Sequence, residues 1–361
     1  MTLARLATPA LLVDVARLDA NIARVAEALA RGAVALRPHW KTSKCLEVAR
    51  RQAAAGAVGF TCSTPAEVSA LGEAGFRGLL WAHLPVGEPK VRFAVEAVQR
   101  YGAVLIADSL AVAGPLSEAM VEAGLVAEVF LDVDTGLGRT GVAPSDAVPV
   151  ARQIAALGGL RLSGVMTHEG HVYGFGDRAD LDRAATSSSQ VLASVAEALR
   201  DAGMPVATVS VGSTPGLASA PYVPGVTEAR PGTYVYNDGN QLRLGTATLD
   251  QCALTVLARV VSVRPGTAII DAGSKALSSD AVSAQNGYGM VLDPDGVPLD
   301  ITFPRANEEH GFLSGPGVAE LGVGDLVRVL PHHACATVNM WSEVVAVRED
   351  LYERWPVVAR H

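Results

Sequence analysis

The stretch GLLWAHLPVGEPKVRFAVEAVQRYGAVLIADS, residues 78–109, contains two short apolar runs separated by a helical pattern. The runs GLLWAHL (78–84) and AVLIADS (103–109) have the length and composition of buried strands. Between them, EPKVRFAVEAVQRYG follows the 3.6-residue period of an amphipathic helix and closes on a glycine, as many helices do. A strand, a helix and a further strand in this order predict that the two strands pair in parallel.

The same alternation runs from about residue 33 to about residue 238. Six further β-like runs occupy residues 33–41, 57–64, 127–136, 162–171, 208–216 and 228–238. Eight strand and helix units at this spacing favour a (β/α)8 barrel over an open doubly wound sheet. The open sheet stays an alternative at this point, because a sequence does not show whether a sheet closes on itself.

After about residue 245 the pattern becomes rich in strands. The segments QCALTVLARVVSVRPGTAIIDAG (251–273) and GDLVRVLPHHACATVNMWSEVVAVRED (324–350) have Pro-Gly and Gly-Asp turn signals and little helical period. We therefore predict a barrel over residues 12–244 and a second, all-β domain over residues 245–361, which also takes in residues 1–11. The histidines and the cysteine of PHHAC are predicted to lie on a strand.

Composition and charge exclude several kinds of partner. Charged residues make up 18% of the chain and its formal net charge is −8, so we expect neither nucleic-acid nor membrane-surface binding. No apolar segment approaches the roughly 20 residues that span a bilayer. The N-terminus lacks the unbroken apolar stretch of a signal peptide, and the four cysteines are scattered. We expect a cytoplasmic protein that acts on a small molecule.

The ends of the predicted strands bring polar residues to the place where barrel enzymes carry their chemistry. Lys41 follows the first run, Arg139 follows the fifth, and His168, His171 and Tyr173 follow the sixth. The two histidines are candidates for proton transfer or for contact with a substrate carboxylate. Alternatively, either could be a hydrogen-bonded core residue.

The loops after the seventh and eighth strands suit a phosphate group. Barrels frequently bind phosphate there, through backbone N–H groups and hydroxyls. The sequences GSTPG and RPGTY supply the candidate residues Gly212, Ser213, Thr214, Gly232 and Thr233. Alternatively, these residues only form turns. A lysine at the first strand end suggests pyridoxal phosphate, because an amine forms a Schiff base with its aldehyde. We expect the neighbouring Lys44 to lie in solvent on the following helix.

Eight motifs in order carry a family resemblance, and with TPALLVDV (8–15) they cover nearly the whole chain. They are LRPHWKTSK, DTGLGRTGV, THEGHVYG, VGSTPG, RPGTYVYND, DAGSKALSSD, EEHGFL and PHHACATVN. Together they resemble the motifs of the fold-type III (alanine racemase-like) pyridoxal-phosphate enzymes. Within that family they are most similar to the group of D-serine dehydratases and D-threonine aldolases.

The resemblance implies roles for individual residues. Lys41 would hold the cofactor covalently and, once freed by substrate, remove the α-proton. Arg139 would lie near the phenolic oxygen of the cofactor and Tyr173 beside its ring. Arg230 stands where the related alanine racemases have an arginine that faces the pyridine nitrogen, although other members of this group differ there. The phosphate would be held by Ser213, Thr214, Gly232 and Thr233.

His333 and Cys335 match the metal-binding pair of the family. Residues i and i+2 of a strand project to one face, so the two side chains could reach one ion while His332 points away. A nitrogen and a sulfur ligand favour zinc, with manganese as the alternative. The spacing alone fits a structural histidine beside a buried cysteine better, and only the resemblance reverses that reading.

The resemblance also indicates a reaction. HACAT resembles the D-serine dehydratases, whereas the aldolases usually carry aspartate in place of Cys335; the following TVNMW is closer to the aldolases. We expect a D-serine dehydratase forming pyruvate and ammonia, with D-threonine and 3-hydroxy-D-aspartate as alternative substrates. The rival functions are a D-threonine aldolase and a non-catalytic carrier of pyridoxal phosphate; an alanine racemase would need no metal. The resemblance further implies a homodimer.

Overall fold

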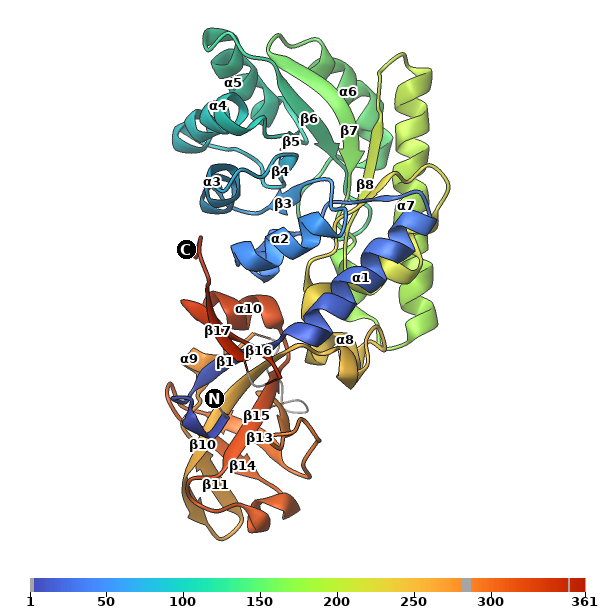
Figure 1. Cartoon of the computed structure of the whole chain (residues 1–361). Coiled ribbons are helices and arrows are strands. Elements are labelled where there is room, and N and C mark those ends of the chain that lie inside the picture. The colour runs from blue at the N-terminus through green and yellow to red at the C-terminus, as the bar shows by residue number, and fades with distance from the viewer. Residues whose placement is uncertain (1–2, 281–286, 350, 361) are drawn as a thin grey trace. The chain divides into compact units, whose positions relative to one another are not determined.

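The computed structural model describes residues 3–280, 287–349 and 351–360 (Figure 1). The chain divides into two compact units. The barrel unit comprises Arg24–Lys41 and Ala49–Gly232, and the β-rich unit comprises Met1–Ala23, Thr42–Val48 and Thr233–Arg360. The domains predicted above also include residues 1–2, 281–286, 350 and 361, which lie outside the described residues.

The barrel unit contains eight parallel strands. They are β2 (Ala35–Leu36), β3 (Phe60–Cys62), β4 (Leu79–Trp81), β5 (Leu105–Ala107), β6 (Ala127–Asp132), β7 (Leu160–Met166), β8 (Thr208–Val211) and β9 (Glu228–Ala229). Six pair in the order β2-β9-β8-β7-β6-β5 and the other two pair as β3-β4. Parallel bridges from His39 to Thr61 and from Leu80 to Val104 join the two sheets at both ends. The ring is therefore closed, and each of the eight predicted runs overlaps one strand.

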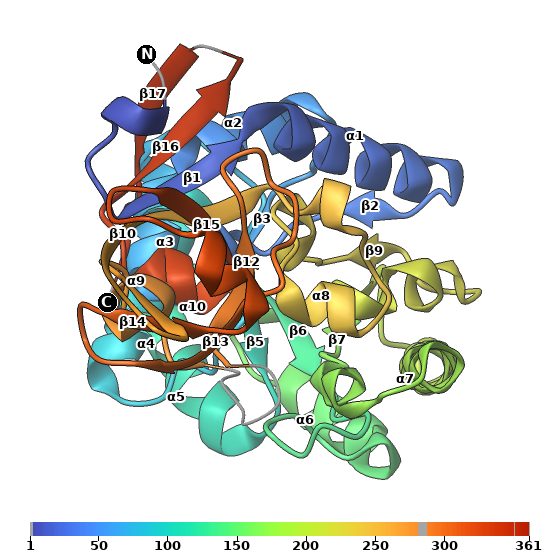
Figure 2. The ribbon, with the colours of Figure 1, turned by 90° about the horizontal axis from the view of Figure 1, so that it is seen from below.

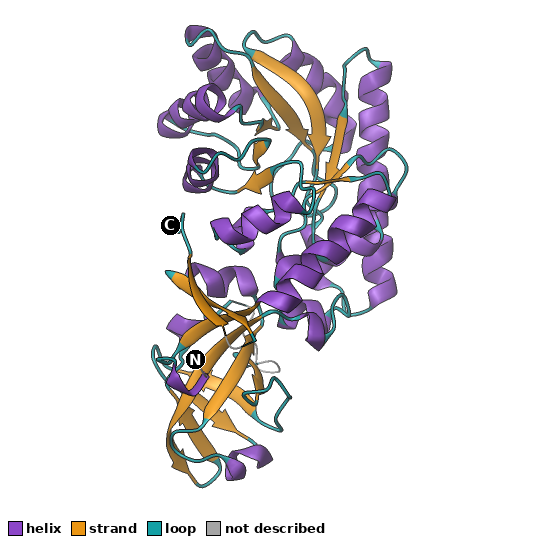
Figure 3. Ribbon diagram, viewed as in Figure 1, coloured by secondary structure: helices purple, strands orange, loops and turns teal. Residues whose placement is uncertain are grey.

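Helices alternate with these strands, as the sequence pattern predicts (Figure 3). They are α1 (Val15–Arg31), α2 (Leu46–Ala54), α3 (Pro65–Glu73), α4 (Glu88–Tyr101), α5 (Leu110–Glu122), α6 (Ala147–Ala155) and α7 (Arg178–Asp201). Helix α4 is followed directly by Gly102, whose φ of 64° is the left-handed conformation that glycine adopts without strain. Two short 3-10 turns, Pro215–Ala218 and Ala220–Tyr222, connect β8 to β9 in place of a helix.

Apolar side chains from successive strands fill the inside of the barrel. Leu80, Ile106, Phe130 and Met166 form one buried cluster, with one residue from each of β4, β5, β6 and β7. Gly164 of β7 leaves room for this packing, because a Cβ atom there would lie 2.7 Å from the Phe130 ring and 2.9 Å from the Thr208 carbonyl oxygen. A side chain at position 164 would therefore collide with the Phe130 ring on one side and with the Thr208 backbone on the other.

We predict that Gly164→Ala lowers the free energy of unfolding by about 1–3 kcal/mol, because neither the ring nor the backbone can move freely away from the added methyl group. Gly176→Ala serves as the matched control, since a Cβ atom there has no neighbour within 4 Å. It should stay within about 1 kcal/mol of the wild type. Urea unfolding followed by circular dichroism would measure both, and equal stability of the two variants would contradict this packing.

The described residues of the β-rich unit form a nine-stranded sheet that is mostly antiparallel (Figure 2). Its strands are β1 (Ala10–Asp14), β10 (Leu254–Arg264), β11 (Thr267–Ile270), β12 (Gly289–Leu292), β13 (Thr302–Ala306), β14 (Gly311–Ser314), β15 (Leu326–Pro331), β16 (Glu343–Arg348) and β17 (Leu351–Pro356). The long strand β10 pairs with β1, β11 and β15, and β1 pairs in parallel with β16.

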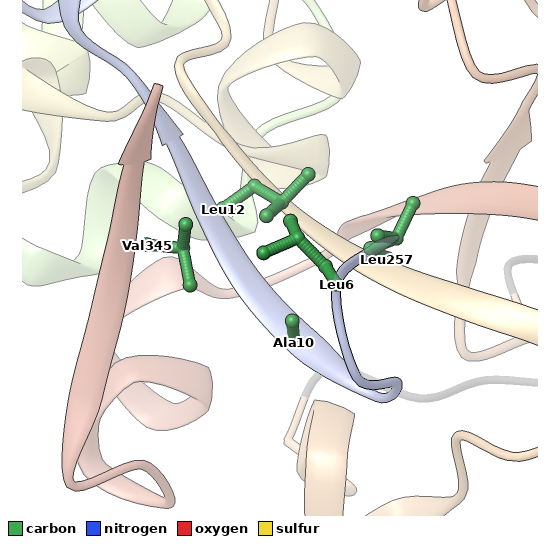
Figure 4. Close-up of a cluster of buried hydrophobic side chains, with 5 residues drawn as sticks. All are labelled: Leu6, Ala10, Leu12, Leu257 and Val345. Carbon is green, nitrogen blue, oxygen red and sulfur yellow. The ribbon is translucent and has the colours of Figure 1, made fainter. Parts of the chain in front are cut away.

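Strand β1 ties the N-terminal segment to this sheet. Ala10 and Leu12 project from the same face of β1 and pack with Leu6, Leu257 and Val345 in a buried cluster (Figure 4). The division of the chain differs from the boundaries predicted at residues 12 and 245. It places residues 12–23, 42–48 and 233–244 in the β-rich unit.

Among the described residues, three short α-helices lie wholly in the β-rich unit, so it is not all-β as predicted. They are α8 (Gly239–Arg243), α9 (Ser274–Leu277) and α10 (Ala334–Asn339). The prediction that His333 and Cys335 lie on a strand was wrong, because β15 ends at Pro331 and Cys335 lies in α10. Beyond Pro331 the backbone bonds to residues 238–240 instead of a strand: the Asn240 N–H donates to the His332 carbonyl oxygen (3.0 Å).

Within the described ranges, no helix combines the length and the apolar character needed to cross a bilayer.

Candidate functional site

Lys41 lies in a short 3-10 turn, Trp40–Thr42, that follows strand β2. Its charge acts on two histidines of the barrel unit: burial, and then the Lys41 charge, lower the pKa of His39 and bring the pKa of His168 to about 3. In the part of the chain that the structure describes, the Lys41 amine has no hydrogen-bond or ion-pair partner. It is therefore available to react with a carbonyl compound.

Lys44 has a different environment from the one predicted for it. The prediction of a solvent-exposed lysine was wrong, because Lys44 is 3% exposed. Its Nζ donates to Asn339 Oδ1 (2.9 Å) and to the Ala359 carbonyl oxygen (3.0 Å) within the β-rich unit. With its amine bonded in this way, Lys44 holds the end of α10. Lys41 is thus the better candidate of the two for a reactive amine.

Arg230 follows β9 and is fully enclosed by its neighbours. Its Nη1 donates to Ser210 Oγ and its Nη2 to the Thr167 carbonyl oxygen, so the guanidinium joins the ends of β8 and β7. Glu228 accepts from Ser210 Oγ (2.6 Å) and from Arg37 Nε (2.7 Å). Burial lowers the pKa of Arg230, and the Glu228 and Glu169 carboxylates oppose that shift. Arg230 therefore fixes the strand ends around the predicted cofactor site.

The loop after β8 is held by residues of the preceding strand end. The Gly212 N–H donates to Glu169 Oε2 (3.1 Å), and the Gly212 carbonyl oxygen lies 2.6 Å from His168 Nδ1. Ser213 Oγ accepts from the Gly216 N–H (3.1 Å), which closes the turn. Both backbone groups of Gly212 are thus engaged, and any phosphate would meet the residues that follow it, Ser213 and Thr214.

The remaining predicted residues lie at other strand ends. Arg139 is exposed in the loop after β6, and its charge also acts on His39 and His168. Tyr173 is half-buried in the turn Gly170–Gly174 after β7. His171 of the same turn has Nε2 3.5 Å from Ser188 Oγ, and its ring packs against Gly136 of the β6 loop. The barrel unit reaches Gly232, and the β-rich unit resumes at Thr233.

Three buried polar atoms at these strand ends have no hydrogen-bond partner among the described residues. They are His39 Nδ1, His171 Nδ1 and Glu169 Oε1. Buried polar atoms are nearly always bonded, so such a group indicates a place that receives a ligand or water. Together with the Lys41 amine and the hydroxyls of the β8 loop, these atoms fit a polar cofactor with an aldehyde and a phosphate.

The predicted metal ligands, His333 and Cys335, lie together at the start of α10 in the β-rich unit. His333 Nδ1 contacts Asp280 Oδ2, and His333 also bonds to Cys335. Burial would lower the pKa of His333, but the charge and hydrogen bond of Cys335, followed by Asp280, raise it to about 10. Thr42 Oγ1 lies 3.1 Å from Cys335 Sγ. Because Asp280 occupies Nδ1, Nε2 is the ring nitrogen left for a metal.

A nitrogen and a sulfur donor side by side fit zinc best. Within the described ranges, no cluster of three or more His, Cys, Asp or Glu side chains could hold a metal ion. A metal bound by His333 and Cys335 would therefore keep open positions for water or substrate, which is the arrangement of catalytic rather than structural sites.

Sequence reasoning missed four residues around these groups. Asp238 bonds the Ala334 N–H (2.9 Å) from 96 positions away, and Asp280 contacts His333 from 53 positions away. Thr42 and Glu169 are the other two. Asp238 and Asp280 do end two of the quoted motifs, RPGTYVYND and DAGSKALSSD, which is the one signal that could have drawn attention to them.

Two family models match consecutive parts of the chain. Residues 13–239 match the alanine racemase N-terminal domain, and residues 253–347 match a putative serine dehydratase domain. This chain belongs to the fold-type III pyridoxal-phosphate enzymes. Pyridoxal phosphate is the cofactor of the family, and the free Lys41 amine fits it.

Relatives of this fold-type III enzyme match it over nearly their whole length. The D-threo-3-hydroxyaspartate dehydratase of Delftia sp. (strain HT23) is 39% identical, covering 97% of this chain and 96% of the relative. The D-threonine aldolase of an Arthrobacter species is 31% identical over 99% and 94%. The D-serine dehydratase of Dictyostelium discoideum is 27% identical over 95% and 94%.

The solved structure of the Delftia dehydratase has the same fold as this fold-type III enzyme. The two superpose with a TM-score of 0.94 and 36% identity, covering 98% of each chain. A cysteine-to-alanine mutant of that dehydratase has been solved in a metal-free form.

We predict that His168 makes the enzyme less stable in acid. Its pKa in the folded protein is about 3, below the ordinary 6.5, so the unfolded state binds the proton more tightly. As the pH falls from about 6.5 towards 3, protonation therefore stabilises the unfolded state relative to the folded one. The urea midpoint should fall less between pH 7 and pH 5 in His168→Gln than in the wild type. In the wild type, His168 lowers the free energy of unfolding by up to about 1.4 kcal/mol for each pH unit in this window. His310→Gln, at an exposed position, is the control. Equal slopes in all three proteins would contradict the prediction.

Proposed function

We propose that this pyridoxal-phosphate enzyme is a lyase that removes water from D-β-hydroxy amino acids, a dehydratase rather than an aldolase. The observation that carries the proposal is the His333–Cys335 pair at the start of α10, with Asp280 on His333. The identity of 39% to a D-threo-3-hydroxyaspartate dehydratase over 97% of the chain supports it. The sequence predicts D-serine as the first candidate substrate, and the likeness to this relative supports D-threo-3-hydroxyaspartate as a second candidate.

Two groups of residues would share the reaction: those around Lys41 in the barrel unit, and the His333–Cys335 pair. Bound pyridoxal phosphate supplies an electron sink for the charge left on the α-carbon. The Lys41 amine takes the α-proton. Among the described residues no hydrogen-bond or ion-pair partner holds this amine, so none has to be displaced first. His168 stays neutral because its pKa is about 3, so it positions Gly212 and is a poor proton donor. His171 keeps a buried Nδ1 without a described partner, so it stays a candidate for contact with the substrate.

His333 and Cys335 would hold a divalent metal, zinc by the nature of the two donors. A metal there would act as a Lewis acid on the β-hydroxyl, which is a poor leaving group on its own. Loss of the α-proton and of hydroxide gives water and an enamine, which hydrolyses to a 2-oxo acid and ammonia. D-serine would thus yield pyruvate, and D-threo-3-hydroxyaspartate would yield oxaloacetate.

The alternative function is cleavage of the Cα–Cβ bond, as in a D-threonine aldolase. The identity of 31% to the Arthrobacter aldolase over 99% of the chain favours it. Against it stands Cys335, where the aldolases that the sequence resembles usually have aspartate. The homodimer and the cytoplasmic location expected from the sequence stay predictions.

Product analysis would separate the two functions. We predict that D-serine, D-threo-3-hydroxyaspartate and D-threonine each give a 2-oxo acid with an equal amount of ammonia, and that EDTA suppresses the yield because the hydroxyl loses its Lewis acid. Chromatography of the products, with zinc added back, would measure this. Glycine as the main product from D-threonine would overturn the dehydratase assignment.

The reactive amine can be tested separately from the products. Lys41→Ala should lose the near-visible absorption band of bound pyridoxal phosphate and fall to background activity, because no other amine replaces it. Lys275→Ala is the matched control, since Lys275 is exposed and paired with Glu308 and Glu309. It should keep both band and activity. A band that persisted in Lys41→Ala would show that another lysine holds the cofactor.

A further inference from the structure

One buried carboxylate joins the starts of two helices in the β-rich unit. Asp238 is 0% exposed. Its Oδ1 accepts from the Gln241 N–H at the start of α8 (3.1 Å), and its Oδ2 accepts from the Ala334 N–H at the start of α10 (2.9 Å). Helix starts leave N–H groups without partners, and a carboxylate is a strong acceptor for them.

The residues next to Asp238 reinforce this link. The Asn240 N–H donates to the His332 carbonyl oxygen (3.0 Å). Gly239 packs so closely that a Cβ atom there would lie 2.6 Å from His332 Nδ1. Residues 238–240 therefore run along residues 332–334, directly beside the two predicted metal ligands. They hold the backbone at the point where β15 gives way to α10.

The direction of the His333 and Cys335 side chains follows from this backbone. His333 is the residue before the first turn of α10, with φ −134° and ψ 102°, and Cys335 lies in that turn. Because His333 is extended and the next residues are helical, the two side chains come together. In a continuous strand they would also share a face, but at a different angle to each other. If the Ala334 N–H lost its acceptor, the chain could fray at this point and separate the two ligands.

We propose that Asp238 is a positioning residue for the His333–Cys335 pair, and that its carboxylate sets the geometry on which metal affinity depends. This inference rests on the metal site of the proposed function. Metal affinity typically falls 10–100-fold when a residue that orients the ligands is removed. The carboxylate oxygens of Asp238 accept from the Gln241 and Ala334 N–H groups, so Asp238 acts on the ligand pair through the backbone of Ala334.

Two substitutions separate the effect on α10 from the effect on α8. In Asp238→Asn the amide has one acceptor oxygen, so one of the two N–H groups meets an NH2 donor in place of an oxygen. In Asp238→Ser the hydroxyl can still cap α8, because serine is a good helix N-cap, but it is too short to serve α10 as well. Asp271→Asn is the matched control in the same unit: Asp271 joins the Arg259 N–H and the Thr8 hydroxyl.

The experiment is a zinc titration of full-length protein carrying pyridoxal phosphate, after chelation, in competition with a coloured chelator of known affinity. We expect Asp238→Asn and Asp238→Ser to bind zinc about 10–100-fold more weakly than wild type, with Asp271→Asn unchanged. Circular dichroism melting of each variant shows that it is folded at the titration temperature. The cofactor band should be unchanged throughout.

Zinc binding by both Asp238 variants as tight as that of the wild type would overturn the inference while leaving the metal site intact. A wild-type protein that bound no zinc would instead overturn the metal site, and the positioning role with it. Equal weakening in Asp271→Asn would show that the effect is general loss of stability in the β-rich unit, which also contradicts the proposal.

Discussion

Eight parallel strands can close into one ring only if all their carboxyl ends lie at the same edge, and this constraint decides where the polar residues of the barrel unit gather. Strands β7, β8 and β9 deliver His168, the Gly212 loop and Arg230 to that edge. Each of these groups bonds to a neighbouring strand end. The ring therefore fixes the surroundings of Lys41 before any cofactor is bound.

A second constraint acts in the β-rich unit, where backbone groups past the end of a strand need partners. Beyond Pro331 they find them in residues 238–240, and the chain turns into α10. This turn brings His333 and Cys335 together. Asp280 and Lys44 complete the surroundings, the first on the imidazole and the second at the far end of the helix. The positions of the two predicted ligands are thus set by bonds to distant parts of the sequence.

The difference between these two constraints explains how much the sequence could predict. The eight strands and the position of Lys41 at a strand end were predictable, because a buried strand and its end are determined by neighbouring residues. Residues 78–109 are an example. The helix α10 was not predictable, because its apolar sequence suits a strand and the N–H group of its first residue, Ala334, bonds to Asp238, 96 positions away. Lys44 was misplaced for the same reason, since its partners Asn339 and Ala359 lie near the other end of the chain.

We propose that His333 and Cys335 together bind the metal that polarises the β-hydroxyl of the substrate. X-ray absorption at the zinc edge would test it most directly, on zinc-loaded wild type and on Cys335→Ser. The account predicts a sulfur neighbour at about 2.3 Å in the wild type, lost in the variant, beside nitrogen or oxygen at about 2.0–2.1 Å in both. A wild-type spectrum with nitrogen and oxygen neighbours alone would contradict it.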